Sequence, residues 1–230
     1  DAGGLFSIDS NSGVVTIAGG LDAETATSHS ITIRATSSDT SFSTTTLSIA
    51  VNDINEFSPV ANDATVAINE DATNGTSVHT VVASDQDATA TLIYSITAGN
   101  GDGVFAIDAN TGAITVADNT NLDREITASY ALTVEVSDGT NTDTATITVN
   151  VGDVDEFDVG AVTDANGAAN TVAEDAILGT TVGVTALADD ADATDTVTYS
   201  LSDDAGGLFT IDANTGVITV ANALDYETAT

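Results

Sequence analysis

Apolar and polar residues alternate in short runs along this chain, which is the pattern of a half-buried β-strand rather than of an amphipathic helix. In the middle of the chain, the apolar runs rich in β-branched residues are 65–68, 78–82, 92–96, 112–116, 130–136 and 145–151. Turn signals containing Gly, Asn or Asp separate them at 74–75, 99–103, 108–112 and 138–139. No segment has a convincing helical period, so the pattern predicts an all-β fold.

The same motifs recur along the chain. Three segments, 6–17, 105–116 and 209–220, resemble one another. Each begins with a stretch of the form Phe-x-Ile-Asp-x-Asn-x-Gly. Each copy is followed by Leu-Asp-x-Glu, at 21–24, 122–125 and 224–227. The spacing of about 100 residues is the size of one β-sandwich domain. The repeats therefore predict tandem seven-strand Greek-key β-sandwiches.

The repeats also set the expected domain boundaries. Residues 1–27 align without a gap on residues 204–230, so the chain starts and stops within a repeat. We expect residues 1–56 to be the C-terminal part of one repeat, 57–156 a complete repeat, and 157–230 the N-terminal part of a third. Because a half sandwich exposes unpaired edges, two interpretations stay open. Either the chain is an excerpt of a longer array, or neighbouring copies complete the halves.

The charge of the chain excludes several classes of partner. There are 36 Asp and Glu residues against only Arg34 and Arg124, which gives a formal net charge of −34. Such a chain has no cationic face for nucleic acid or for an anionic membrane surface. There is no cysteine, hence no disulfide or thiolate metal site, and no apolar run approaches the length of a membrane span. A hydrophobic content of 42% in periodic runs distinguishes the chain from a disordered acidic segment.

The acidic residues fall at repeated positions. Of eight glutamates, only Glu135 lies outside the recurring motifs. Carboxylates gathered without lysines repel one another and need a cation, and clustered oxygen ligands select Ca²⁺. The spacings Asp-x-Glu and Asp-x-Asp place two carboxylates on one side of an extended segment, where both can reach one ion. The sequence thus predicts Ca²⁺ sites.

Five motifs together resemble the calcium motifs of cadherin repeats, in the order in which that family has them. They are Leu-Asp-Arg-Glu at 122–125, Asp-x-Asn-Glu-Phe at 53–57, Asn-Glu-Asp at 69–71, Asp-x-Asp at 85–87 and Val-Ser-Asp-Gly at 136–139. The resemblance covers the whole chain and is closest to the cadherin-like repeats of large bacterial surface proteins. It implies that calcium sits between consecutive domains and stiffens the linker.

The resemblance also implies the ligands. At the junction of the first and second repeats they would be Asp22, Glu24, Asp53, Asn55, Glu56, Asp85, Asp87 and Asp138. At the junction of the second and third they would be Glu70, Asp123, Glu125, Asp153, Asp155, Glu156, Asp190 and Asp192. Glu174, Asp225 and Glu227 would serve a third junction. Asp189 and Asp195 are expected to be exposed acids rather than ligands.

Two kinds of motif depart from familiar calcium-binding patterns. Glu56 and Phe57 stand where the cadherin family has Asp-Asn, and Pro59 follows only in the first linker. In the second linker Asp155 stands where Asn is usual, and these departures leave one to three ions per junction open. The Asp-x-Asn-Thr-Gly stretches lack the glutamate that ends an EF-hand loop. We therefore expect hairpin turns there, with Asp capping and Gly at positive φ. Tyr94 and Tyr199 recur in one strand and are expected to pack in the core.

The expected function is structural rather than enzymatic, because no catalytic constellation recurs. The chain is expected to be a calcium-binding adhesive module of a repetitive protein, located outside the cell on a bacterial surface. Its expected partners are neighbouring repeats of the same protein, with homophilic or homopolymeric contacts or surface glycans beyond them. The alternatives are a self-assembling filament or surface-layer subunit, and a carbohydrate-binding module.

Overall fold

The computed structural model describes residues 1–192 and 194–227, which form two compact units. The first consists of Asp1–Ile68, Ala72–Asn121 and Ser129–Asn150. The second consists of Asn69–Asp71, Leu122–Ala128 and Val151–Thr230. These divisions differ from the expected repeat boundaries after residues 56 and 156, which stay a prediction.

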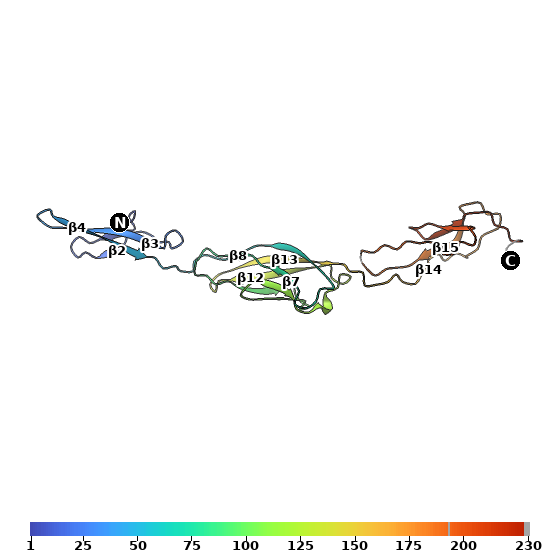
Figure 1. The fold of residues 1–230 in the computed structure, drawn as a ribbon, viewed down its shortest axis with the longest axis horizontal. Helices are drawn as coiled ribbons and strands as arrows, with labels where there is room; N and C mark the ends of the chain where they lie inside the picture. The colour runs from blue at the N-terminus through green and yellow to red at the C-terminus, as the bar shows by residue number, and fades with distance from the viewer. Residues whose placement is uncertain (193, 228–230) are drawn as a thin grey trace. The chain divides into compact units, whose positions relative to one another are not determined.

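The middle of the chain forms a sandwich of two mainly antiparallel sheets (Figure 1). Its strands are β6 (Ala64–Asn69), β7 (Ser77–Thr80), β9 (Ile93–Ala98), β10 (Phe105–Ile107), β11 (Ala113–Val116), β12 (Ser129–Ser137) and β13 (Thr142–Gly152). One sheet has the order β6-β13-β12-β9 and the other β10-β11-β7. A short antiparallel pair, β5 (Val60–Ala61) with β8 (Ala83–Ser84), adds to it. The predicted all-β sandwich fold is confirmed.

The core of the sandwich follows from the alternation in its longest strands. Since successive side chains of a strand point to opposite faces, every second residue of β12 and β13 faces inward. The fully buried ones are Leu132, Val134, Val136, Ile147 and Val149. The opposite sheet supplies Ile114 and Val116 of β11, which are equally buried. Burial of each such side chain contributes about 1.5–3 kcal/mol, so these two strands carry much of the stability of the sandwich.

The remaining strands form smaller sheets. Near the N-terminus, β1 (Phe6–Ile8) pairs with β2 (Val15–Ile17), and β3 (Ser28–Thr36) pairs with β4 (Phe42–Ala50). In the second unit, β14 (Thr163–Asp164), β15 (Thr181–Leu187), β17 (Val217–Val220) and β16 (Phe209–Ile211) form one sheet in that order. No α-helix occurs among the described residues, which include a 3₁₀ turn at Asn119–Asn121. Within the same residues, no helix is long and apolar enough to cross a membrane.

One predicted strand is shorter than expected. The apolar run 78–82 forms strand only as far as Thr80, and β8 begins again at Ala83. The pairing of β7 with β11 changes register between Ile114 and Thr115. Val81 still enters the core, at 3% exposure, but its N–H donates to the carbonyl of Gly112 outside the ladder. The break therefore arises from tertiary pairing, which an apolar run cannot reveal.

The Asp-x-Asn-Thr-Gly stretches at 108–112 and 212–216 form the predicted hairpin turns, and so does the related Asp-Ser-Asn-Ser-Gly stretch at 9–13. In the middle copy, the Asp108 carboxylate accepts hydrogen bonds from the N–H groups of Asn110 and Thr111, at 3.0 and 2.9 Å. Gly112 follows at φ +69°. The N–H of Thr111 is also the main reason why the pKa of Asp108 is lowered. The other copies repeat the arrangement, with Asp9 and Gly13 (φ +74°) and with Asp212 and Gly216 (φ +69°).

Replacing one turn glycine should test how tightly the hairpin packs. A Cβ at Gly112 would lie 3.1 Å from the ring of the buried Tyr94, whereas a Cβ at Gly139 (φ +93°) meets nothing within 4 Å. Both substitutions to Ala incur the backbone cost of positive φ, about 1–2 kcal/mol. We expect Gly112→Ala to lower the free energy of unfolding by about 1 kcal/mol more than Gly139→Ala, because the ring must move. Urea denaturation of both variants measures the difference, and equal losses would contradict the packing argument.

Candidate metal sites

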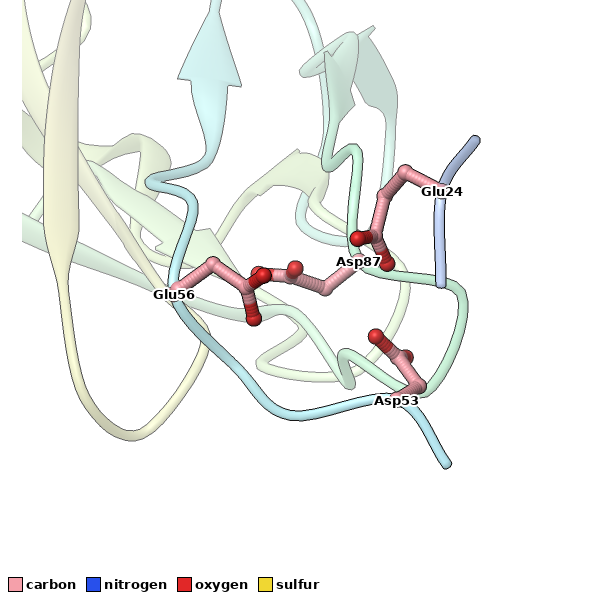
Figure 2. A group of neighbouring side chains, drawn as sticks. All are labelled: Glu24, Asp53, Glu56 and Asp87. Atoms are coloured by element: carbon pink, nitrogen blue, oxygen red, sulfur yellow. The ribbon is translucent and has the colours of Figure 1, made fainter. Parts of the chain in front are cut away.

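Carboxylates from separate loops converge at one place in the first unit. Glu24 lies between β2 and β3, Asp53 and Glu56 follow β4, and Asp87 follows β8. An oxygen of each lies within 4.8 Å of an oxygen of every other, and Figure 2 shows the four groups pointing toward one another. Asp87 also belongs to a second group, with Asp85 and with Asp138 after β12. We call these residues, together with Asn55, the first acidic site.

Backbone and side-chain hydrogen bonds orient this site. Asp87 is only 3% exposed, and its Oδ2 accepts from the N–H of Phe57 at 2.9 Å. The N–H of Asp87 in turn donates to Asp85 Oδ1 at 3.0 Å, which closes a tight turn in the Asp-x-Asp segment. The Asn55 amide donates to the carbonyl of Asp138 at 3.3 Å. Asp87 and Asp85 each use one carboxylate oxygen in these hydrogen bonds, and Asn55 uses its amide nitrogen.

The remaining oxygens have no hydrogen-bond partner among the described residues, although they are buried. They are Glu24 Oε2, Asp53 Oδ1, Asn55 Oδ1, Asp85 Oδ2, Asp87 Oδ1 and Asp138 Oδ2. Buried polar atoms left unpaired are costly and rare. Sites made only of oxygen ligands suit Ca²⁺, which takes about six to eight oxygen ligands. The residues of the first acidic site therefore fit a calcium ion.

Mutual repulsion is visible in the ionisation of the site. The pKa of Glu24 is raised to about 7, chiefly because its carboxyl group lies close to that of Asp53. Burial raises the pKa of Glu56, and the charges of Asp87 and Asp53 raise it further. Asp53 has a lowered pKa, mainly because the Thr89 hydroxyl donates to it. Without a cation, the surroundings of Glu24 and Glu56 thus disfavour their charged forms.

The second unit contains two similar groups of carboxylates. We call their residues, Glu70, Glu125, Asp153, Asp155, Asp192 and Asp195, the second acidic site. Oxygens of Glu70, Glu125 and Asp153 lie within 4.8 Å of one another. Glu70 is 8% exposed and accepts two backbone hydrogen bonds, from the N–H of Val154 at 2.7 Å and of Arg124 at 2.5 Å. Its carboxylate therefore joins the segment after β13 to the Leu-Asp-Arg-Glu loop.

A further group at the second acidic site includes a residue that the sequence did not predict. Asp155, Asp192 and Asp195 bring oxygens within 4.8 Å of one another. Asp192, 3% exposed, accepts from the N–H of Phe157 at 3.0 Å, as Asp87 does from Phe57. Asp195 is exposed, as expected, but partial desolvation and the charge of Asp155 raise its pKa. The sequence signal that could have identified Asp195 is its position three residues after Asp192.

A third group lies at Glu174, Asp225 and Glu227, all of them exposed. The N–H of Tyr226 donates to Glu174 Oε2 at 3.0 Å, which matches the contact between Arg124 and Glu70. This terminal cluster contains the three ligands expected for a third junction.

Four predicted carboxylate ligands lie outside these groups, and their role as ligands stays a prediction. They are Asp22, Asp123, Glu156 and Asp190. Asp22 accepts from the N–H and hydroxyl of Thr25, and Asp123 accepts from the N–H of Ile126 at 2.8 Å. These two residues thus cap their own loops. The pKa of Glu156 is raised to about 7 by burial and by the charges of Glu70 and Glu125, so Glu156 lies within the field of the second acidic site.

The raised pKa values predict an unusual pH dependence for the metal-free protein. Between the ordinary value of 4.5 and about 7, folded Glu24 and Glu156 bind protons that the unfolded chain has released. Stability should therefore fall as pH rises through this window. We expect the unfolding midpoint in chelator to decrease from pH 5 to pH 8, and the double variant Glu24→Gln/Glu156→Gln to show a flatter profile. A midpoint that rose with pH over this range would contradict the prediction.

Comparison with known proteins places these sites in context. The family model described as "Cadherin domain" matches residues 64–152 and 169–230, more than half of the chain. Human Cadherin EGF LAG seven-pass G-type receptor 2 is 36% identical over 227 residues, covering 96% of this chain and 8% of that protein. Human Protocadherin Fat 1 is 36% identical over 240 residues, covering 99% of this chain and 5% of that protein. The chain thus spans less than a tenth of these relatives.

Solved structures give a consistent comparison. The extracellular domain of Protocadherin GammaB4 superposes with a TM-score of 0.83 at 25% identity, covering all of this chain and 40% of that one. Mouse Cadherin-23 EC22-24 gives a TM-score of 0.70 at 27% identity, covering 97% of this chain and 74% of that one. The curated relatives named above are animal proteins, so they do not support the expectation of a bacterial surface protein.

Proposed function

Since this chain belongs to the cadherin domain family, a family of non-enzymatic adhesion modules, we propose that it is a calcium-binding segment of a large extracellular adhesion protein. Calcium would bind at the first and second acidic sites, where each linker meets the following repeat. The expected partners are the neighbouring repeats of the same protein. Homophilic contacts between copies are a further expectation, and so is a location at the cell surface.

The observation that carries this proposal is the set of six buried, unpaired oxygens at the first acidic site. They come from the loop before β3, the linker after β4 and two loops of the middle sandwich. The carboxylates among them fall into two groups that share Asp87. Cations bound by these groups would crosslink segments that otherwise repel one another. Calcium would thereby convert a repulsive linker into an ordered one.

The alternative functions have less support. A carbohydrate-binding module needs an exposed aromatic platform. Tyr94 and Tyr130 are buried, and the exposed aromatic side chains among the described residues, Phe42, Phe157 and Tyr226, come from three separate segments of the chain. A self-assembling filament and a bacterial source stay separate predictions, and the animal relatives favour neither.

The proposal is tested by titrating the chelator-treated protein with Ca²⁺ in a calorimeter while following backbone amide relaxation by NMR. We expect binding at both sites, and loss of fast motion for the amides of residues 53–57 on saturation. Binding without ordering of these amides would argue against a stiffening role. No binding at millimolar Ca²⁺ would refute the proposed function itself.

A further inference from the structure

A threonine stands beside a linker aspartate at both acidic sites. Thr89 donates twice to Asp53 Oδ2, from its N–H at 3.0 Å and from its hydroxyl at 2.7 Å. Thr194 makes the same two contacts to Asp153 Oδ2, from its N–H at 3.0 Å and from its hydroxyl. In both cases the threonine comes two residues after the Asp-x-Asp segment, so the local pattern is Asp-x-Asp-x-Thr.

These contacts determine how the aspartate is presented. Because both donors of Thr89 converge on Oδ2 of Asp53, that oxygen is engaged and the carboxylate cannot rotate freely. The other oxygen, Oδ1, is buried without a hydrogen-bond partner in the described structure, and Asp53 belongs to the group formed with Glu24, Glu56 and Asp87. The threonine thus fixes which oxygen of Asp53 is offered to a cation.

We propose that Thr89 and Thr194 are positioning residues for calcium, each acting through the aspartate that it holds. This inference rests on the proposed calcium-binding function. Neither threonine would touch the ion. Partners that orient a metal ligand typically change metal affinity about 10–100-fold when they are removed. The same paired contact occurs at both sites, in the same Asp-x-Asp-x-Thr pattern.

The test removes only the hydroxyl. Thr89→Val keeps the shape of the side chain and the backbone N–H but loses the donor, whereas Thr89→Ser retains the hydroxyl. Thr120 supplies a matched control, because its N–H and hydroxyl also donate to one carboxylate, Asp118, at 3.1 and 2.8 Å. Asp118 belongs to none of the acidic groups found among the described residues.

Each site has its own reporter in the full chain. Calcium titrations followed by ¹H–¹⁵N NMR can use the amides of Phe57 and Phe157, which donate to Asp87 and Asp192. We expect Thr89→Val to weaken calcium binding at the first acidic site by about tenfold or more and to leave the second unchanged. Thr194→Val should do the reverse. Thr89→Ser and Thr120→Val should both bind like the parent protein.

Three results would overturn the inference. Unchanged affinity in Thr89→Val would show that the hydroxyl does not position Asp53. Equal weakening in Thr120→Val would show a general effect of losing a surface hydrogen bond. Equal weakening in Thr89→Ser would show that side-chain packing, and not the hydroxyl, determines calcium affinity. An NMR spectrum of each metal-free variant verifies that the variant is folded. If the parent protein itself binds no calcium, the proposed function fails instead, so the two failures are distinguishable.

Discussion

Millimolar Ca²⁺ should raise the thermal unfolding midpoint of the metal-free protein by about 10 °C. A ligand present at ten times its Kd stabilises the folded state by about 1.4 kcal/mol per site. One ion at each of the two acidic sites therefore contributes about 3 kcal/mol, and about 1 kcal/mol shifts the midpoint of a chain of this size by roughly 2–4 °C. The gain includes relief of the repulsion among the carboxylates, which adds to the effect of Asp53 on the pKa of Glu24 and to the effect of burial on the pKa of Glu156.

Calorimetric scans of the chelator-treated protein, with and without Ca²⁺, measure this shift. Mg²⁺ is the first control, because it demands a smaller octahedral shell and keeps its water ligands, so its effect should be much smaller. Sodium chloride at matched ionic strength is the second, since screening alone would relieve repulsion among exposed carboxylates. If sodium chloride reproduced the shift, the acidic groups would be a salt-adapted surface rather than cation sites.

Asp87→Asn should have opposite effects with and without calcium. Asp87 belongs to both carboxylate groups of the first acidic site and is 3% exposed. Asparagine can still accept the hydrogen bond from Phe57 but lacks the negative charge. In chelator, removal of that charge should raise the unfolding midpoint, because the pKa of Glu56 is raised partly by Asp87. In calcium, the variant should be less stable than the parent by about 1–2 kcal/mol, since one site loses a central ligand.

Two comparisons make this crossover specific. Asp192→Asn changes the matching residue of the second acidic site and should show the same reversal. Asp118→Asn removes an exposed charge outside the acidic groups found in the described residues. It should therefore change the unfolding midpoint by the same amount in chelator and in calcium. A loss of stability for Asp87→Asn in both conditions would indicate a purely structural aspartate.

The long strands were predictable because burial imposes their alternation. Residues 130–136 and 145–151 were identified from this pattern alone and lie within β12 and β13. The three-residue strand β10 and the pair β5–β8 are too short to show a period, and pairing with neighbours defines them. The Asp108 turn was predictable because its geometry depends only on residues within the turn.

The acidic sites were predictable only in outline. Recurring spacing identified the segments that carry Glu24, Asp53 and Asp87, which the structure brings together. Spacing could not reveal which carboxylates are already engaged by their own loops, as Asp22 is by Thr25. Nor could it place Asp195 beside Asp155, because that proximity depends on how the loop after Asp192 folds.

The direction of β6 relative to β13 has a mechanical consequence. These neighbouring strands run parallel, since Asp63 lies beside Thr146 and Glu70 beside Gly152. A tension applied through the chain would pull β6 by its N-terminal end and β13 by its C-terminal end. Such a load shears the pair, so that its interstrand hydrogen bonds resist together rather than opening one at a time. The middle sandwich is therefore expected to resist a pulling force applied to the two ends of the polypeptide.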